Sequence, residues 1–330
     1  MALPVNRTWL PGNPAERTPW EFLLAVAAAT AAFVYLLAVV AGHTAHHAAD
    51  TEVRDIGTGR PAGSSVDGSR GAGPSSGDEA AALEAAIRGV LAPEEAASTG
   101  VAVMTPAGDW LGGLNPDLPR YAASTFKLAV LLEAERRVSA GALSYTDRVP
   151  VTEEARAEDL GTIDRLPVAP DGTVSLGEAL EAMVTFSDNA SAVALLRLLG
   201  PAEIDASLRV LGAELFSVND PGLPVTARDL ALVLAAIARG DGMSAAQRDH
   251  ALGLLTAQEV RSGIPAALDG MPGVRRVGNK TGTWPGATRD AAFVETGRGT
   301  YVVAVMAEGD WNWELVRRVA RAVHEQLTSR

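Results

Sequence analysis

An uncharged apolar run near the amino terminus constrains this chain more than any other feature of its 330 residues. The run, FLLAVAAATAAFVYLLAVVA at positions 22–41, is 20 residues long. As an α-helix it would extend about 30 Å, which is the thickness of the hydrocarbon core of a bilayer. Because the segment is apolar on every side, a transmembrane helix over residues 21–42 is favoured over the alternative, a helix buried in a soluble core.

The charges beside this run predict its orientation. Arg7 and Arg17 precede it, whereas no Lys or Arg follows it until Arg54. The positive-inside rule then places residues 1–20 in the cytoplasm and the chain beyond the run outside the cell membrane. The alternative is a secreted protein, with a signal peptide cleaved before Gly42, but signal peptides have shorter apolar regions of about 7–15 residues. We expect an uncleaved, single-pass anchor.

Residues 43–77 have the composition of a flexible linker. The stretch GTGRPAGSSVDGSRGAGPSSG consists mostly of Gly, Ser and Pro and has little to bury. A coil of this length has a root-mean-square span of about 30 Å. Three histidines at positions 43, 46 and 47 form a small cluster that we interpret as solvated rather than metal-binding. The linker would keep a folded domain close to the membrane surface.

Composition excludes several classes of function. The net charge of −12 lies outside residues 1–42, whose two Arg and two Glu cancel, so nucleic acid is not an expected partner. Cysteine is absent, which excludes disulfides, thiolate metal sites and a cysteine nucleophile. No spacing of His, Asp and Glu in the domain resembles a metal site, so we expect neither a metal nor a cofactor. We expect a monomer.

Residues 78–330 are expected to form one folded domain of the α/β class. A helical pattern opens it at DEAAALEAAIRGVLA, and two short strand-like runs follow at GVAVM and WLGGL. From Ser124 to about Leu268 the patterns are mostly helical, and strand patterns return before a final helix. This order predicts an antiparallel sheet made from both ends of the domain and flanked by terminal helices, with an inserted all-helical subdomain. The expected site is a cleft between them.

The two lysines of the chain are candidate catalytic residues. Among 28 basic residues, only Lys127 and Lys280 are lysines. A desolvated lysine can lose its proton near neutral pH and act as a base, whereas arginine stays charged. Ser124 precedes Lys127 by three residues at the start of an apolar helical run, so the two share a helix face. Lys127 could therefore take the proton of a serine in a first turn that favours negative charge.

Two further motifs support a serine–lysine mechanism, whereas the histidines do not support a serine–histidine mechanism. His250 and His324, the only histidines of the domain, lie near no serine motif, and each fits a helix face. The sequence SDN at 187–189 stands between two helical patterns, and KTG at 280–282 ends a strand pattern. Alone, the first could be an ordinary helix cap and the second an ordinary strand end. The three motifs occur in this order along the chain and use both of its lysines, which makes a chance occurrence improbable.

On these motifs, residues 80–328 resemble the class A β-lactamases and the wider family of penicillin-interacting serine enzymes. The resemblance extends to TVSLGEALEAMVTFSDNASAVALLRLLG, which looks like the family's helix before its second motif and the helix after it. It also covers LTAQEVRSGIPAAL, which looks like the segment before the third motif. The resemblance implies an α/β fold with a helical subdomain and a reaction through an acyl-Ser124 intermediate.

The resemblance also implies catalytic roles. Ser124 would be the nucleophile, and Lys127 its base or part of the proton relay. Ser187 would pass the proton to the leaving nitrogen, with Lys280 supplying positive potential. The backbone N–H groups of Ser124 and Thr283 would form the oxyanion hole, where each donor stabilises the transition state by about 3 kcal/mol.

Substrate-binding roles follow in the same way. Asn189 would hold the amide side chain of the substrate, while Asp188 would be mainly structural. Thr281 and Gly282 would contact the substrate, and the Thr281 hydroxyl would form a hydrogen bond with the substrate carboxylate. Arg289 would be a carboxylate-binding arginine, or alternatively a surface arginine on a strand.

The sequence departs from the family in its deacylation loop. Class A enzymes carry an E-x-x-L-N pattern whose glutamate activates the hydrolytic water. Here the corresponding region reads LGAELFSVNDPGLPVTARDLA and contains no such pattern. Glu214 and Asp220 are its only candidate bases. The expected function is an anchored serine hydrolase acting on a β-lactam, with slow turnover as one outcome of the missing pattern.

Two alternatives remain open. One is a D,D-peptidase-like or penicillin-binding protein acting on cell-wall peptides, and the other is a non-catalytic binding protein that retains the fold. Trp284, directly after Thr283, would narrow the site, stack on a substrate or serve in packing.

Overall fold

The computed structural model describes residues 76–329. The predicted cytoplasmic segment and membrane anchor, and the predicted linker up to residue 75, lie outside these residues. Between Ser76 and Ser329, no helix has the length and apolarity needed to cross a membrane. Among the described residues, helix α2 (Ser76–Gly89) comes first, and it begins two residues before the predicted start of the domain.

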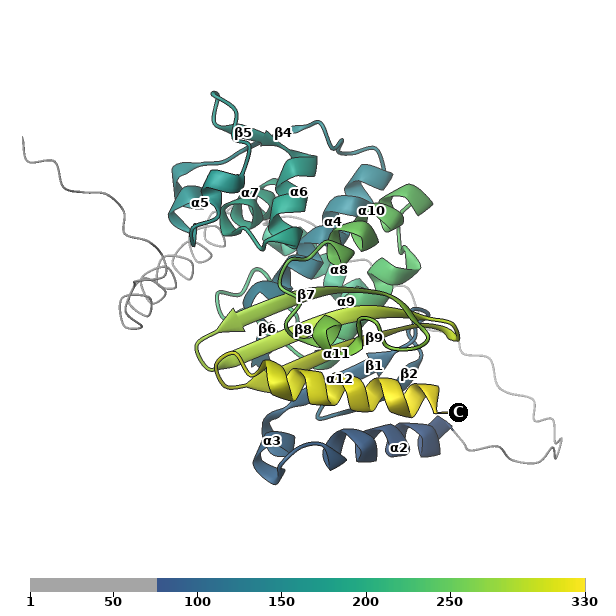
Figure 1. Ribbon diagram of the computed structural model, residues 1–330. Helices are drawn as coiled ribbons and strands as arrows, with labels where there is room; N and C mark the ends of the chain where they lie inside the picture. The colour runs from purple at the N-terminus through teal and green to yellow at the C-terminus, as the bar shows by residue number, and fades with distance from the viewer. Residues whose placement is uncertain (1–75, 330) are drawn as a thin grey trace, which may run out of the picture.

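A five-stranded antiparallel sheet forms the centre of the fold, in the strand order β2-β1-β9-β8-β7. Its strands come from both ends of the domain, as predicted: β1 (Gly100–Met104), β2 (Trp110–Leu114), β7 (Val274–Trp284), β8 (Ala287–Thr296) and β9 (Gly299–Glu308). The early strand β1 pairs directly with the last strand β9. Strand β7 is an edge strand, and Figure 1 shows it as the strand nearest the helical half of the protein.

The sheet is buried on both faces because its side chains alternate between two apolar cores. Along β9, Val303 and Val305 pack with the terminal helices, whereas Val302 and Ala304 face the core of the helical half. The terminal layer consists of α2, α3 (Pro93–Ser98), α11 (Ile264–Leu268) and α12 (Trp313–Thr328). In Figure 1, α12 and α2 run side by side below the strands. This arrangement confirms the flanking terminal helices.

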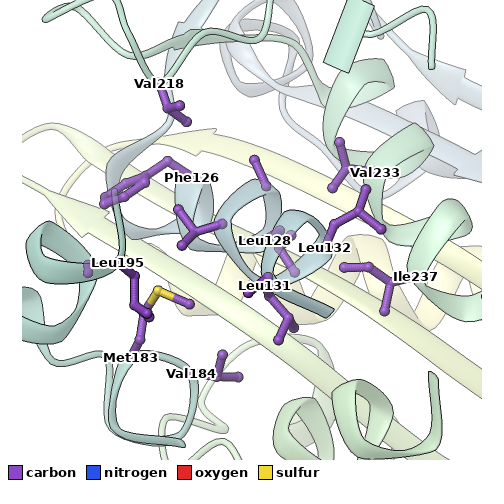
Figure 2. Close-up of a cluster of buried hydrophobic side chains, with 14 of the residues drawn as sticks. Phe126, Leu128, Leu131, Leu132, Met183, Val184, Leu195, Val218, Val233 and Ile237 are labelled. Carbon is purple, nitrogen blue, oxygen red and sulfur yellow. The ribbon is translucent and has the colours of Figure 1, made fainter. Parts of the chain in front are cut away.

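Helix α4 (Lys127–Ser139) is the central element of the helical half. It is buried without interruption from Lys127 to Glu135. Figure 2 shows Leu128, Leu131 and Leu132 of this helix surrounded by apolar side chains from several elements. Truncating a leucine in such a position to alanine costs about 2–5 kcal/mol. The remaining helices of this half are α5 (Glu153–Ala157), α6 (Leu176–Thr185), α7 (Asn189–Leu199), α8 (Pro201–Val210), α9 (Ala227–Arg239) and α10 (Ala245–Thr256), with two 3₁₀ turns, η2 (Ala123–Phe126) and η3 (Ile163–Arg165).

The prediction of an all-helical inserted subdomain is wrong in one respect. Strands β4 (Arg148–Pro150) and β5 (Thr173–Ser175) form a two-stranded sheet within it. A second small sheet pairs β3 (Arg120–Tyr121) with β6 (Pro224–Val225). Strands of two or three residues show no alternation of polar and apolar residues that a sequence pattern could reveal.

Candidate active site

Ser124 lies at the junction between the sheet and the helical half. It belongs to η2, directly before the central helix α4, and it is half-buried. The preceding residue, Ala123, has a φ of 47°, a left-handed conformation that is uncommon for a residue with a side chain. Such strain persists only where the surroundings fix the backbone, and it clusters at functional sites. The turn thus presents Ser124 at the start of a rigid, buried helix.

Strand β7 approaches this turn closely because position 282 is a glycine. A Cβ atom at Gly282 would lie 2.9 Å from the Ala122 carbonyl oxygen and 3.0 Å from the Ser124 backbone nitrogen. Real Cβ atoms do not approach backbone atoms at such distances. The KTG motif and the serine turn are therefore in backbone contact, with Thr283 half-buried one residue further along β7.

The SDN motif forms the connection between α6 and α7. Ser187 has a φ of 61°, a second left-handed residue in the site. Asp188 is the N-cap of α7, and its Oδ1 accepts hydrogen bonds from the Ser191 backbone N–H at 2.9 Å and the Ser191 hydroxyl at 2.8 Å. Its other oxygen accepts from the Thr162 hydroxyl at 3.2 Å. These contacts are those expected of a structural aspartate.

The Lys127 ammonium group connects the first and second motifs. Its Nζ donates to the Ser187 carbonyl oxygen at 2.6 Å and to Asn189 Oδ1 at 2.8 Å, and it lies 3.1 Å from Ser187 Oγ. Within residues 76–329, no hydrogen bond joins Lys127 Nζ to Ser124 Oγ. The structure therefore brings Lys127 to the SDN loop, while Ser124 remains its neighbour along the chain.

Lys280 reaches the same hydroxyl from the sheet. Its Nζ lies 3.0 Å from Ser187 Oγ and 3.0 Å from the Thr281 carbonyl oxygen. Both lysine side chains are fully buried. Ser187 Oγ is thus held between two amines, one from each half of the protein, which is the geometry of a proton relay.

Burial changes the protonation of both amines. It lowers the pKa of Lys127 well below 10.5, and the nearby charge of Lys280 lowers it further, against an opposing effect of Asp188. Burial also lowers the pKa of Lys280 to about 7, against the opposing charge of Asp290. The shift favours the neutral form of the Lys127 amine, which is the form that a proton acceptor requires.

The model of the beta-lactamase enzyme family matches residues 82–327 of this chain. The chain belongs to the beta-lactamase enzyme family. This membership confirms the predicted resemblance and the prediction that the protein is a serine hydrolase with an acyl-enzyme mechanism. No curated protein gave a significant match.

Solved structures agree with this assignment. PBP-A superposes with a TM-score of 0.65 at 25% identity, over 75% of this chain and 96% of that one. A PBP-A L158E mutant, described as an acyl-enzyme complex with penicillin G, gives 0.65 at 26% identity over 75% and 97%. An ancestral class A beta-lactamase gives 0.64 at 26% identity over 74% and 99%.

Gln258 is a site residue of this beta-lactamase family member that the sequence did not reveal. Its Nε2 donates to Thr281 Oγ1 at 3.2 Å, while its Oε1 accepts from the Val260 N–H at 2.9 Å. The second contact fixes which end of the amide is oxygen. Because Thr281 Oγ1 accepts from Gln258, its own hydrogen is free to donate to a ligand. Glutamine carries no sequence signal for such a role, which depends on tertiary packing.

Arg289 is engaged in structural contacts. Its side chain is about 1% exposed. The guanidinium donates to the carbonyl oxygens of Tyr121 (3.2 Å) and Ala307, and to Glu308 Oε1 at 3.1 Å. Burial lowers its pKa, against the charge of Glu308. These contacts tie β8 to β9 and to β3, and the burial of Arg289 shows that the alternative of a surface arginine on a strand is wrong.

Neither predicted deacylation base contacts the catalytic groups described above. Glu214 is exposed in the loop after α8. Asp220 is exposed in a turn, where its Oδ1 accepts from the Gly222 N–H at 2.7 Å. A different carboxyl, Glu158 at the end of α5, is buried at 2% exposure, and burial raises its pKa to about 7. Nothing in the sequence distinguished Glu158, because its burial arises from packing between helices.

The remaining predictions concern residues around the site. Trp284 packs edge-on against Tyr121, with ring centroids 5.8 Å apart. His250 Nδ1 lies 2.6 Å from Glu135 Oε1, and His324 Nδ1 lies 3.0 Å from the Tyr301 hydroxyl. The two histidines are satisfied helix-face residues, as predicted. Residues 76–329 contain no group of His, Asp and Glu side chains that could hold a metal ion.

Proposed function

We propose that this protein is a serine hydrolase that opens the amide bond of β-lactams through an acyl-Ser124 intermediate. The observation that carries the proposal is the convergence of two buried amines on Ser187 Oγ, beside the Ser124 turn. Neutral Lys127 takes the hydroxyl proton as Ser124 Oγ attacks the carbonyl carbon. As the C–N bond breaks, Ser187 passes the proton to the departing nitrogen, with Lys280 beside it.

The backbone and β7 supply the remaining interactions. The N–H groups of Ser124 and Thr283 stabilise the oxyanion, with each donor contributing about 3 kcal/mol. The Thr281 hydroxyl, whose hydrogen is free, and a protonated Lys280 bind the substrate carboxylate. Asn189 holds the amide side chain, and Gly282 allows the substrate to align along β7. A relative described as acylated by penicillin G, at 26% identity, supports this substrate class.

A cell-wall peptide ending in a carboxylate is the second candidate substrate. The specific observation in its favour is that Glu214 and Asp220 are exposed and make no contact with the catalytic groups. A protein that acylates readily and deacylates slowly would behave as a penicillin-binding, D,D-peptidase-like enzyme. The acylation chemistry at Ser124 is the same for both substrates.

The proposal includes a location. We place residues 1–20 in the cytoplasm, the anchor in the cell membrane and the catalytic domain outside, as a monomer. The support is the uncharged run at 22–41 and the absence of Lys and Arg between it and Arg54. Added protease should digest the domain in intact cells, and a domain that resists until the membrane is opened would contradict this orientation.

Intact-mass spectrometry tests the function. The full chain in detergent is mixed with penicillin G and sampled over time, with Ser124→Ala as the control. We expect a mass increase equal to one penicillin on the wild type only. A long-lived adduct favours the peptidase-like candidate, whereas rapid penicillin loss with a transient adduct favours a β-lactamase. The absence of both an adduct and hydrolysis would contradict the two candidate enzyme functions and favour a non-catalytic binding protein that retains the fold.

A further inference from the structure

Ser187 lies in a loop whose residues on both sides are held by one segment of the helical half. This segment is η3 together with the residue before it. On one side of Ser187, the Thr162 hydroxyl donates to Asp188 Oδ2 at 3.2 Å. On the other side, the Arg165 guanidinium lies over the Phe186 ring, 3.9 Å from its centroid. The SDN loop is therefore held from outside its own motif.

Arg165 is itself fixed by an ion pair with Glu259. Nη1 of the guanidinium donates to Glu259 Oε2 at 3.0 Å, and Nη2 donates to Oε1. A contact through both nitrogens sets the orientation of the guanidinium plane, which a lysine ammonium could not reproduce. The ion pair thus keeps the cation over the Phe186 ring, where a cation–π contact stabilises the loop.

Glu259 belongs to the segment between α10 and α11, which contacts two of the three catalytic motifs. The Glu259 backbone N–H donates to the Thr185 carbonyl oxygen at 2.8 Å, at the end of the helix before the SDN loop. The neighbouring Gln258 side chain donates to Thr281 Oγ1 of the KTG motif at 3.2 Å. Arg165 therefore connects the SDN loop to the segment that also contacts β7.

The Ser187 hydroxyl needs such support because its position depends on both halves of the protein. It lies 3.1 Å from Lys127 Nζ of α4 and 3.0 Å from Lys280 Nζ of β7. Ser187 also has a φ of 61°, a strained conformation that persists only where the surroundings hold it. A loop free to relax toward an ordinary φ would move the hydroxyl away from the two amines.

We propose that Arg165 is a positioning residue for the proton transfer from Ser187 to the leaving nitrogen. This inference rests on the proposed function. Arg165, oriented by Glu259, holds Phe186 and thereby keeps the Ser187 hydroxyl between the two lysine amines. Arg165 itself exchanges no proton. Both side chains of the pair are about half exposed, at 47% and 51%, so breaking the pair should cost little stability.

The step that depends on this positioning is the breaking of the C–N bond during acylation. Lys127 takes the proton of Ser124 as the C–O bond forms. The Ser187 proton passes to the departing nitrogen, and Lys127 returns a proton to Ser187 Oγ. An amide nitrogen leaves poorly without a proton, whereas p-nitrophenolate leaves without one near neutral pH. A displaced Ser187 should therefore slow acylation by an amide far more than acylation by a p-nitrophenyl ester.

The test compares these two acyl donors on the full chain in detergent. The donors are penicillin G and the p-nitrophenyl ester of phenylacetylglycine, which carries the same phenylacetamido group. Intact mass gives the rate of acylation by each donor. We expect Arg165→Gln to react with penicillin G about 3–30-fold more slowly, the loss of one exposed ion pair and one cation–π contact. Its rate with the ester should stay within about twofold of the wild type. Arg165→Lys keeps the charge without the planar fork and should recover part of the loss.

A matched control and a second background complete the experiment. Arg88→Gln breaks an ion pair of similar exposure on α2, that of Arg88 with Glu84, and should leave both rates unchanged. In a Phe186→Leu background the ring is absent, so Arg165→Gln should slow acylation by penicillin G much less than it does in the wild type.

The outcomes separate this inference from the proposed function. An unchanged rate with penicillin G in Arg165→Gln, or equal slowing with both donors, overturns this inference alone. A wild type that shows neither an adduct nor turnover with either donor overturns the proposed function and, with it, this inference.

Discussion

Replacing Glu158 by glutamine should stabilise the protein at neutral and alkaline pH. Within the described part of the chain, the carboxyl is buried without a partner, and burial raises its pKa from an ordinary 4.5 to about 7. Each tenfold change in an acid constant corresponds to about 1.4 kcal/mol. Ionised Glu158 therefore destabilises the folded state by at most about 3 kcal/mol. A neutral amide is also buried without a partner, but at a lower cost than a carboxylate.

The stability difference between the wild type and Glu158→Gln should depend on pH. Below about pH 4.5, Glu158 is protonated in both the folded and the unfolded chain, and ionisation carries no penalty. Between about pH 4.5 and 7 the unfolded chain ionises while the folded chain stays protonated, and above pH 7 the folded chain must bury the charge. The stability of the wild type relative to Glu158→Gln should therefore fall across this window. We expect the variant to be more stable by about 1–3 kcal/mol at pH 8, and the difference to shrink toward pH 5.

Urea unfolding of both proteins at pH 5 and pH 8 checks this prediction. Glu153→Gln makes the same change at an exposed position of α5 and serves as the control, so its free energy of unfolding should follow that of the wild type at both pH values. A stability difference for Glu158→Gln that is equal at pH 5 and pH 8 would refute the reasoning, because only an ionisation can make it change.

Other residues yield predictions of the same kind. Lys127→Met should slow acylation by at least about 10²-fold, because Ser124 loses its proton acceptor, and the rate of adduct formation measures this. Gln258→Leu should weaken acylation by penicillin G about tenfold more than acylation by its methyl ester, because the Thr281 hydroxyl is no longer oriented toward a carboxylate; equal losses in kcat/KM would contradict this. Gly282→Ala should displace β7 from the serine turn, lower the free energy of unfolding by about 1–3 kcal/mol and abolish the adduct.

The sequence could predict the fold and the catalytic motifs because both depend on patterns of residues that are neighbours in the chain. Strand alternation and helical spacing extend over many residues in β7 to β9 and in α4. The residues of each motif are neighbours in the chain. In the fold, strand β7 and the SDN loop bring Lys280 and Ser187 together with Lys127. The two lysines were informative for the same reason, since their rarity is visible without a structure.

What the sequence could not predict depends on contacts between distant residues. Lys127 and its partner Ser187 are 60 positions apart, so helical spacing pointed to Ser124 instead. Arg289 has the residue type of an anion-binding group, but its carbonyl partners lie on other strands. Glu158 and Gln258 owe their surroundings to packing and hydrogen bonds between separate elements, which no local pattern records.

The pairing of β1 with β9 has a consequence for biogenesis. Val101 and Val305 are partners about 200 residues apart, so the middle of the sheet closes only after β9 has been synthesised. Such long loops close slowly. Strand β2 can pair with β1 at once, but the other edge of β1 must wait for β9. A chain exported in an extended state would cross the membrane before it could assemble, and its nucleophile would become competent only on the far side. The strand order thus delays closure of the central sheet until β9 has been synthesised.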